Sequence, residues 1–206
     1  MGTRSKAARP VVPRVEQVER NRRDLQAAAR QVFRQVGYAR ASIDAIAEAA
    51  GFTKGAVYSH FSSKADLFLS LLEDRIEERR QLQRSAIEDA IASGEFRTFI
   101  HGVFRASRQD PQWRLAVLEF RVVAARDPEL NARYAAAHRH TFEGVKEALE
   151  RADETFDVEL RPSIGLIARA ALAVDTGGYL EDLAEPGSMS DDDLTELCCR
   201  LAGVGR

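Results

Sequence analysis

Residues 42–61 read SIDAIAEAAGFTKGAVYSHF, and this stretch decides the fold. A helix-turn-helix needs a small residue where its two helices touch, a glycine in the turn and a β-branched hydrophobic residue that fixes the second helix. Ala47, Gly51 and Val57 meet these needs in the right order. Three such residues also arise in an ordinary helical hairpin of an alanine-rich chain, so the flanking segments have to support the assignment.

The flanking segments have the helical spacing and the capping residues that a helix-turn-helix domain requires. Upstream, an apolar pattern of three- and four-residue spacing stops at Gly37, which suits the position directly after a helix. Thr53 is the expected N-cap of a helix running to about Phe61, and Ser63 with Asp66 is typical of the capping box of a further helix. The upstream apolar residues are Leu25, Ala28, Ala29, Val32, Phe33 and Val36.

The rest of the chain also has helical periodicity, and no alternating run predicts a strand. Pro111, Pro128 and Pro162 stand where helices start, at positions where the missing N–H has no cost. The predicted fold is all-α, with a compact bundle of three short helices followed by a larger helical bundle. The later helices are predicted near residues 96–109, 111–125, 128–152, 162–184 and 191–202.

The chain has 206 residues, of which 45% are hydrophobic and 30% are charged. This composition supplies a sizeable core and excludes a disordered chain or a disulfide-stapled miniprotein. The formal net charge of −2 hides a gradient, because residues 1–64 carry 12 basic and 5 acidic residues whereas residues 65–206 carry 18 and 27. The first part therefore has a net charge of +7 and the second of −9, so only the N-terminal part is suited to a polyanion.

The sequence carries neither membrane nor secretion signals. No segment approaches the roughly 18 consecutive apolar residues of a membrane span, and the basic N-terminus has no apolar segment of a signal peptide. Cys198 and Cys199 are adjacent, so they form neither a disulfide framework nor a metal-ligand spacing. We therefore expect a cytoplasmic protein without a membrane partner.

Three motifs together resemble the TetR family of bacterial transcription regulators. They are VGY at residues 36–38, the run over residues 41–61 and SSKADLF at residues 62–68, and the resemblance covers residues 18 to about 75. It implies an N-terminal three-helix helix-turn-helix DNA-binding domain and a larger C-terminal helical domain for ligand binding and dimerisation. The implied divisions are a flexible basic arm over residues 1–15, the DNA-binding domain over 16–75 and the effector-binding and dimerisation domain over 76–206.

The helix after the turn is expected to read DNA. Val57 and Phe61 point inward at helical spacing, which leaves the intervening side chains free to face a major groove. The expected base or groove contacts are Thr53, Lys54, Gly55, Tyr58 and Ser59, and the phosphate contacts that the resemblance implies are Ser42, His60 and Lys64. Arg22, Arg23 and the arm are further candidates. Alternatively, Tyr58 and His60 cover the bundle, Lys54 is merely solvated, the arm is an unstructured tail and the hydroxyl residues serve only as helix caps.

A helix-turn-helix protein reads a palindrome as a dimer, so a homodimer is expected. The last two helices are the natural interface, because ARAALAVDTGGYL over residues 168–180 is apolar around much of its surface. The resemblance implies the same interface. The interface candidates are Asp175, Gly177, Gly178, Leu197 and Leu201. Asp175, inside the apolar run, either pairs with an arginine at the interface or contacts a ligand.

An aromatic-rich group in the C-terminal part is suited to a hydrophobic or aromatic small molecule. The helix near residues 111–125 is apolar on most sides and should lie centrally. The pocket candidates are Phe99, Phe104, Trp113, Val117, Phe120, Tyr134, His138 and Phe142. The alternative is that these are plain core residues, His138 included. Glu119 and Arg121 pair either with neighbouring residues or with a ligand.

The sequence thus predicts a bacterial regulator that binds a palindromic double-stranded operator as a dimer, is associated with the nucleoid when bound, and is released by a small hydrophobic effector. The helix that begins at Lys64 is the expected lever between the two parts. The alternative is a constitutive or activating regulator without a ligand. No enzyme is expected, with no catalytic residues, cofactor or metal, because the four histidines form no metal-binding motif and no glycine-rich phosphate loop occurs.

Overall fold

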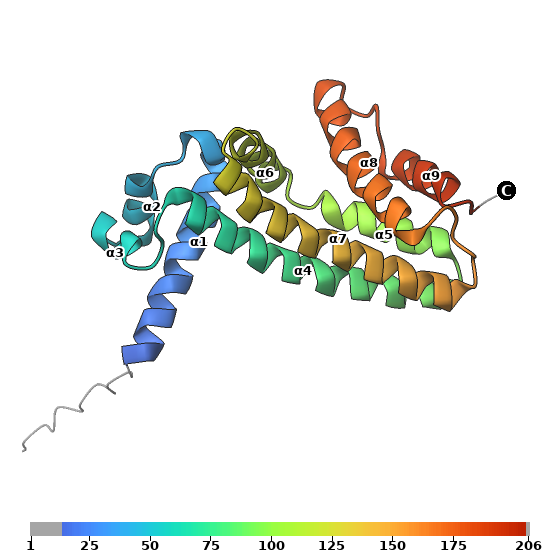
Figure 1. Cartoon of the computed structure of the whole chain (residues 1–206), viewed down its shortest axis with the longest axis horizontal. Helices are drawn as coiled ribbons and strands as arrows, with labels where there is room; N and C mark the ends of the chain where they lie inside the picture. The colour runs from blue at the N-terminus through green and yellow to red at the C-terminus, as the bar shows by residue number, and fades with distance from the viewer. Residues whose placement is uncertain (1–13, 205–206) are drawn as a thin grey trace, which may run out of the picture.

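The computed structural model describes residues 14–204, apart from the side chains of Arg14, Gln83, Ala86 and Ile87. Most of the predicted basic arm lies outside the described residues. Within them the chain is all-α, as predicted, with nine helices and no strand (Figure 1). The helices are α1 (Arg14–Arg40), α2 (Ile43–Ala50), α3 (Lys54–Tyr58), α4 (Lys64–Ser93), α5 (Phe96–Ser107), α6 (Pro111–Ala124), α7 (Pro128–Phe156), α8 (Ile164–Ala184) and α9 (Asp191–Leu201).

The helix-turn-helix forms from the expected local signals. The Ser42 side chain accepts a hydrogen bond from the Ala45 N–H (3.1 Å), and Thr53 caps α3 in the same way through Ala56 N–H (3.2 Å). Gly51 takes the left-handed conformation that ends α2. α3 is shorter than predicted: after Tyr58 the chain leaves the helix in a tight turn.

α1 is interrupted at Gly37, where the expected helix stop lies. Gly37 has φ 79° and ψ 169°, a conformation essentially restricted to glycine. A short turn through Arg40 follows. The Glu119 side chain of α6 accepts a hydrogen bond from the Ala39 N–H in this turn (2.8 Å). The interruption therefore lies where the N-terminal helices meet α6.

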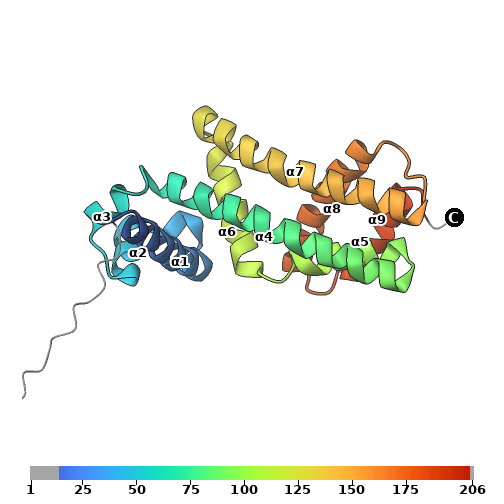
Figure 2. The same ribbon diagram turned by 90° about the horizontal axis from the view of Figure 1, so that it is seen from below.

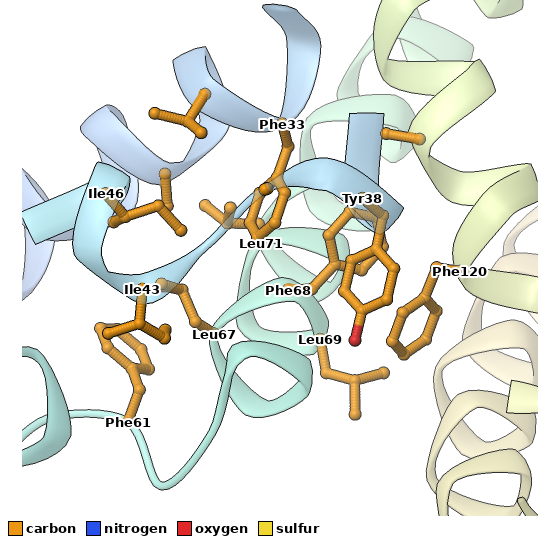
Figure 3. Packing of buried hydrophobic residues seen from close by; sticks show 14 of the residues in the cluster. Phe33, Tyr38, Ile43, Ile46, Phe61, Leu67, Phe68, Leu69, Leu71 and Phe120 are labelled. Atoms are coloured by element: carbon orange, nitrogen blue, oxygen red, sulfur yellow. The ribbon is translucent and has the colours of Figure 1, made fainter. Parts of the chain in front are cut away.

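One hydrophobic core joins the N-terminal helices to α6 (Figure 3). The Phe68 ring of α4 stacks on Phe120 with ring centres 4.7 Å apart, and on Trp113 at 5.0 Å. Tyr38, just after the Gly37 interruption, meets Phe120 edge-on at 4.8 Å. Because Trp113 and Phe120 belong to α6, the core of the N-terminal helices continues beyond residue 75.

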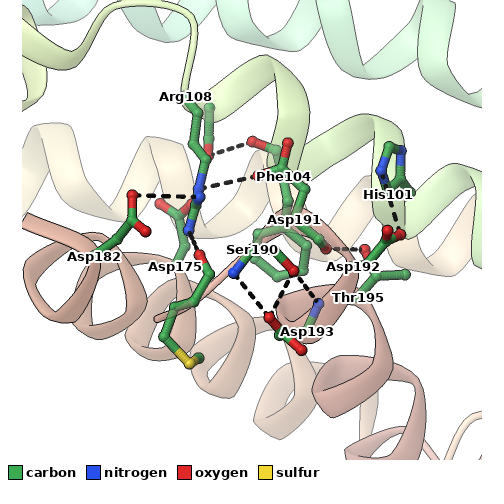
Figure 4. A network of polar contacts seen from close by, with 12 residues as sticks. His101, Phe104, Arg108, Asp175, Asp182, Ser190, Asp191, Asp192, Asp193 and Thr195 are labelled. Atoms are coloured by element: carbon green, nitrogen blue, oxygen red, sulfur yellow. Dashed lines mark hydrogen bonds and ion pairs between the residues drawn. The ribbon is translucent and has the colours of Figure 1, made fainter. Parts of the chain in front are cut away.

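A second core holds α5, α7, α8 and α9 together at the other end of the molecule (Figure 2). Polar contacts reinforce it: Arg108, directly after α5, lies 3.0 Å from Asp191 of α9 and 3.9 Å from Asp182 of α8 (Figure 4). Ser190 and Asp193 form a capping box at the start of α9. α3 and the pair α8–α9 lie at opposite ends of the molecule (Figures 1 and 2).

Several helix ends differ from the sequence prediction. Ser63 caps α4, but the Asp66 carboxylate accepts from Ser62 N–H (2.9 Å), so the expected capping box is displaced by one residue. Pro162 lies before the first turn of α8, because Ser163 is its N-cap. α7 continues to Phe156. Pro111 and Pro128 open α6 and α7 as predicted.

Candidate DNA interface and effector cavity

The side chains predicted to read DNA lie on the exposed surface of α3 and its caps. Thr53, Lys54, Gly55, Tyr58 and Ser59 are all exposed. Val57 is fully buried below them, as the inward-facing residue should be. The Ser59 hydroxyl donates to Ala56 O (2.7 Å), so its hydrogen is already used within the turn.

Packing inside the protein does not require the residue types found at Gly55 and Tyr58. A Cβ at Gly55 would meet only Thr53 Oγ1, at 3.9 Å, so internal packing does not require a glycine there. Tyr58 is 48% exposed, an unusual place for a large aromatic side chain. Both features suit a helix whose outer surface meets another molecule closely.

Lys54 is held by a neighbouring carboxylate at the same surface. Its Nζ lies 2.9 Å from Asp44 Oδ2 of α2, and that hydrogen bond raises the Lys54 pKa. Both side chains are more than half exposed. The ammonium is therefore positioned at the surface, and a stronger anion such as a phosphate, or a guanine edge, can replace Asp44 as its partner.

Two of the three predicted phosphate contacts lie beside this surface. Ser42 is exposed at the N-terminus of α2. His60 is half-buried, and its carbonyl lies 3.4 Å from Arg22 Nη1, whose guanidinium lies over the Phe61 ring at 4.5 Å from the centre. Arg22 therefore fixes the turn after α3 and places a cation next to it.

The third predicted phosphate contact, Lys64, has a different role. Its Nζ donates to the carbonyls of Tyr38 (2.8 Å), Ala39 (3.3 Å) and Ala41 (2.8 Å), and lies over the Tyr38 ring. These three bonds use all the donors of the ammonium. Burial lowers the pKa of Lys64. In this structure Lys64 therefore ties the start of α4 to the end of α1, and its predicted phosphate contact stays a prediction.

A cavity of about 620 Å³ lies between α4, α6, α7 and α8, a size typical of small-molecule sites. Five of the eight predicted pocket residues line it: Trp113, Val117, Tyr134, His138 and Phe142. Phe120 does not line it, because its ring is fully buried in the core against Phe68. Phe99 and Phe104 are also misassigned: they lie in the second core and line a separate void of about 30 Å³.

Sequence reasoning missed most of the charged lining of this cavity. Five arginines line it: Arg75, Arg79, Arg114, Arg121 and Arg169. Of these, only Arg121 is a candidate from the sequence, as a residue that pairs either with a neighbour or with a ligand. A usable signal is Arg114, which interrupts the apolar run of α6 and is largely buried, since a buried charge needs a partner.

Asp175 pairs with an arginine, as one reading of the sequence expected, but it faces into its own domain. Its carboxylate lies 3.0 Å from Arg114 Nη2 and accepts from the Ser107 hydroxyl (2.5 Å). The Arg114 guanidinium also lies over the Tyr179 ring, 4.1 Å from the centre. Asp175 is buried and lines the cavity, so its assignment to the outer interface surface is wrong.

His138 stands among cations in the same cavity. Its ring stacks on Tyr134 with centres 5.9 Å apart. Burial lowers the pKa of His138, and the positive charges of Arg121 and Arg169 lower it further. This neutral imidazole, one turn of α7 away from the Tyr134 hydroxyl, adds a hydrogen-bonding group to an otherwise cationic part of the wall.

The other predicted interface residues are divided between two faces of α8 and α9. Gly178 is buried, and a Cβ there would lie 2.6 Å from Leu194 Cδ2 of α9, so this glycine serves packing within the chain. Gly177 is exposed, and nothing lies within 4 Å of a Cβ built on it. Leu197 and Leu201 are 39% and 43% exposed.

Among the side chains that the structure describes, no group of three or more His, Cys, Asp and Glu residues is arranged to hold a metal ion. Between residues 14 and 204, none of the helices has the length and apolar character to cross a bilayer.

Two family models match the chain. Residues 25–71 match the model described as bacterial regulatory proteins of the tetR family, and residues 92–203 match the BetI-type transcriptional repressor C-terminal model. The first match contains the helix-turn-helix. The second covers more than half of the chain and includes most of the residues around the cavity.

Characterised regulators resemble the chain over most of its length. It is 28% identical over 182 residues to the transcriptional repressor AcnR of Corynebacterium efficiens, covering 80% of this chain and 90% of that protein. It is 26% identical over 162 residues to the transcriptional activator FasR of Mycolicibacterium smegmatis, covering 78% and 72%. The crystal structure of the regulator FadR from Bacillus subtilis in complex with stearoyl-CoA has a TM-score of 0.66 at 16% identity, covering 89% and 99%.

Proposed function

Because the chain belongs to the TetR family of DNA-binding transcription regulators, we propose that it is a ligand-responsive repressor. It binds a palindromic operator as a homodimer through α3 and the caps around it. A small molecule with a hydrophobic part, bound in the 620 Å³ cavity, releases it. Regulators rather than enzymes are its relatives.

The observation that carries this proposal is the wall shared by the cavity and the N-terminal core. Trp113 lines the cavity and stacks on Phe68, and Tyr134 lines it and meets Phe120 edge-on with centres 5.9 Å apart. Both partners belong to the core that holds α1 and α2. A ligand that displaces either wall residue therefore moves the support of the DNA-reading helices.

Two helices are suited to carry that displacement. α6 lines the cavity with Trp113 and is bound to the end of α1 through Glu119. α4 lines it with Leu72, and at its start Lys64 holds the carbonyls after Gly37. The predicted role of α4 as the lever is therefore extended to α6. Both helices act on the same short segment, residues 37–41.

A ligand shifts DNA binding only as far as its affinity differs between the two states of the protein. To move the dimer from almost fully bound to almost fully free requires a difference of about 5.5 kcal/mol. A buried aromatic wall supplies contacts of that order, since each large side chain that is covered or exposed contributes about 2 kcal/mol. The cavity is therefore large enough for the proposed response.

The relatives support a transcription regulator, but their names differ on whether it represses or activates. AcnR is named a repressor and FasR an activator, and the FadR structure holds stearoyl-CoA. A repressor is favoured because the C-terminal model that matches residues 92–203 is a repressor model. The alternative is an activator or a constitutive regulator, in which the cavity has no effector.

The homodimer is proposed to form through the outward faces of α8 and α9. Leu166, Leu180 and Leu183 of α8 are 55%, 47% and 49% exposed, and Leu197 and Leu201 of α9 lie on the same end of the molecule. So many exposed leucines on two adjacent helices are typical of an interface rather than of a free surface. Gly177, which is exposed but also lines the cavity, is proposed to lie at the edge of this interface.

The test is binding of the full chain to the DNA that flanks its own gene, with the salt concentration varied. We expect protection of a palindrome, a steep negative dependence on salt and a loss of about tenfold or more for Tyr58→Ala or Lys54→Ala. Lys146→Ala is the matched control, since Lys146 is paired with Glu150 on α7, far from α3. Parental binding by both α3 variants would contradict the assignment of the DNA-reading helix.

A further inference from the structure

The charges around the cavity do not balance. Five arginines line it, against only two carboxylates, Asp110 and Asp175. A cavity wall with this excess of cations attracts anions and repels cations. Whether the excess is available to a ligand depends on which of the arginines already have partners.

Both carboxylates are already neutralised by arginines. Asp175 is bound by Arg114 at 3.0 Å. Asp110 is bound by Arg34 of α1 at 3.1 Å and also accepts from the Trp113 N–H at the start of α6. Neither carboxylate is therefore free to pair with a cationic group of a ligand.

Arg75 and Arg79 also have partners, although that of Arg79 is distant. Arg75 lies 2.7 Å from Glu78 on its own helix, a carboxylate that it shares with Arg30 of α1 at 2.8 Å. Arg79 reaches Asp175 only at 3.9 Å, and that carboxylate already belongs to Arg114. Arg79 therefore adds to the uncompensated positive charge of the cavity, together with the remaining two arginines.

Arg121 of α6 and Arg169 of α8 have no carboxylate within 4 Å among the described side chains. Each guanidinium lies over an aromatic ring of α7 instead: Arg121 over Tyr134 at 5.8 Å and Arg169 over Phe142 at 4.2 Å from the ring centres. His138 stands between these rings in the sequence of α7 and feels both charges. Both guanidinium groups therefore line the cavity on rings of the same helix, Arg121 half-buried and Arg169 exposed.

We propose that the effector of this cavity is an amphipathic anion whose carboxylate or phosphate is held by Arg121 and Arg169. Its apolar body lies against Trp113 of α6 and Leu72 and Ile76 of α4, which line the same cavity. Guanidinium groups bind both kinds of oxyanion in two-pronged fashion. This inference rests on the proposed function of the cavity and names the chemical class of its ligand.

This arrangement also connects the anion to the DNA-reading part. Arg121 is two residues from Glu119 on α6, and the Glu119 carboxylate holds the Ala39 N–H after the Gly37 interruption. An anion that pulls Arg121 toward Arg169 draws α6 toward α8. The contact at Ala39 then has to shift, so the head group and not only the apolar body of the ligand contributes to the response.

The experiment measures binding of matched probes to the full-length protein by calorimetry. The probes are straight-chain and phenyl-substituted carboxylates of eight to sixteen carbons, with the primary alcohol and the trimethylammonium compound of the same chain. Alkyl phosphates of the same lengths form a separate arm, which distinguishes a carboxylate from a phosphate ligand. All are used below their micelle-forming concentrations.

We expect a carboxylate or a phosphate to bind at least about tenfold more tightly than the alcohol, and the ammonium compound to bind most weakly. The double variant Arg121→Gln with Arg169→Gln loses this preference, with a fall of about tenfold to 100-fold for the anion and little change for the alcohol. Arg139→Gln is the control: Arg139 is an exposed arginine of the same α7 region that does not line the cavity.

The possible results separate this inference from the proposed function. Equal binding of anion and alcohol, tighter binding of the ammonium compound, an unchanged preference in the double variant or no binding of any probe would overturn the inference. Anion binding that is lost in the double variant but leaves operator binding unchanged supports the inference and contradicts the ligand-responsive repressor. Release of the operator by the alcohol as effectively as by the acid would contradict the inference and support the ligand-responsive repressor.

Discussion

Gly37 and Gly94 have nearly the same φ, 79° and 72°, but different surroundings. A Cβ on Gly37 would lie 2.5 Å from the Glu119 carboxylate, whereas nothing lies within 4 Å of one on Gly94. The Glu119 carboxylate cannot simply move away, because it holds the Ala39 N–H. The two glycines therefore differ both in backbone conformation, with ψ 169° at Gly37 and 14° at Gly94, and in the contact between α1 and α6.

We expect Gly37→Ala to lower the free energy of unfolding by about 2–3 kcal/mol, and Gly94→Ala by about 1 kcal/mol. The larger loss has two causes, the less accessible ψ of Gly37 and the displaced hydrogen bond. Urea unfolding followed by circular dichroism measures both variants. Equal losses in the two variants would contradict both causes.

Lys54 and Lys64 are a second informative pair, because only Lys54 is exposed at the α3 surface. Lys64→Met removes three donors from carbonyls at the end of α1, so we expect unfolding to become easier by about 2 kcal/mol. Lys54→Met should leave stability almost unchanged, since an exposed ion pair contributes little, and should reduce the salt slope of DNA binding by about 1.

The measurement combines thermal unfolding with DNA titrations at several salt concentrations. Lys64→Met should keep the parental salt slope at a temperature where the variant is folded. A reduced slope in Lys64→Met would restore the phosphate contact that the resemblance implied and that the three carbonyl bonds argue against.

His138 leads to a prediction of how the stability of the fold depends on pH. Its pKa in the folded protein is lowered by burial and by Arg121 and Arg169, with Tyr134 stacked on its ring. The unfolded chain therefore takes up a proton at about pH 6.5, where the folded chain does not. Stability from this group is complete above about pH 6.5 and is lost as the pH falls toward the lowered value.

We expect His138→Gln to lose less stability than the parent protein between pH 7 and pH 5.5, since glutamine fills a similar space without titrating. Thermal unfolding over this range, in buffers of constant ionic strength, compares the two. His140→Gln is the control, because His140 is exposed two residues further along α7. Parallel pH profiles for parent and His138→Gln would contradict the lowered pKa.

At the scale of elements, the sequence predicted most helices because their signals are local. Ser42, Thr53 and Gly51 act within one turn of the chain, so the helix-turn-helix was read correctly from spacing and caps. α3 was predicted too long because Phe61 continues the apolar spacing of Val57. Its ring reaches the core from a turn instead.

The cavity was harder to predict, because helical periodicity tells which side chains face inward but not which interior they enter. Phe99 and Phe120 both point inward, yet one enters the second core and the other the first. The arginines were missed for a related reason. A periodic pattern counts Arg114 or Arg169 as an outward residue until a neighbouring helix is seen to supply Asp175 or Phe142.

The two adjacent glycines of α8 show how one helix serves two surfaces. Gly178 faces Leu194 of α9, whereas Gly177 is exposed and lines the cavity. We expect Gly178→Ala to destabilise the chain by about 1–3 kcal/mol through overpacking, as judged by thermal unfolding. Gly177→Ala should not destabilise the protomer, because alanine is the better helix former and no atom of this chain obstructs it.

The same substitutions separate packing from assembly. Gly177→Ala, although harmless to the protomer, narrows the approach of a second helix and should weaken dimerisation at high dilution. Loss of protomer stability in Gly177→Ala equal to that in Gly178→Ala would mean that both glycines serve the contact between α8 and α9.

At the scale of the whole molecule, charge and shape agree. The sequence up to residue 64 has a net charge of +7 and the rest has −9, and α3 lies at the end opposite α8 and α9 (Figures 1 and 2). An acidic body at the far end is repelled by a duplex that the basic end attracts. This polarity orients the chain on DNA before any base is read.

The opposite ends also explain why assembly should control DNA binding. A dimer joined through α8 and α9 fixes the separation of its two α3 helices, which have to meet successive major grooves. We expect Leu180→Glu or Leu201→Glu to convert the dimer to a protomer of 22.9 kDa, as measured by light scattering after size-exclusion chromatography. Operator affinity should fall by about 100-fold, because two linked half-site contacts become independent.

Ile91→Glu is the matched control for that experiment. Ile91 of α4 is 53% exposed, comparable to Leu180 at 47% and Leu201 at 43%, but it lies outside the α8–α9 face. All three substitutions place the same charge on an exposed apolar side chain, so only the position differs. A dimer that persists in Leu180→Glu and Leu201→Glu but dissociates in Ile91→Glu would move the interface to α4. In that case the exposed leucines of α8 and α9 would not set the spacing of the DNA-reading helices.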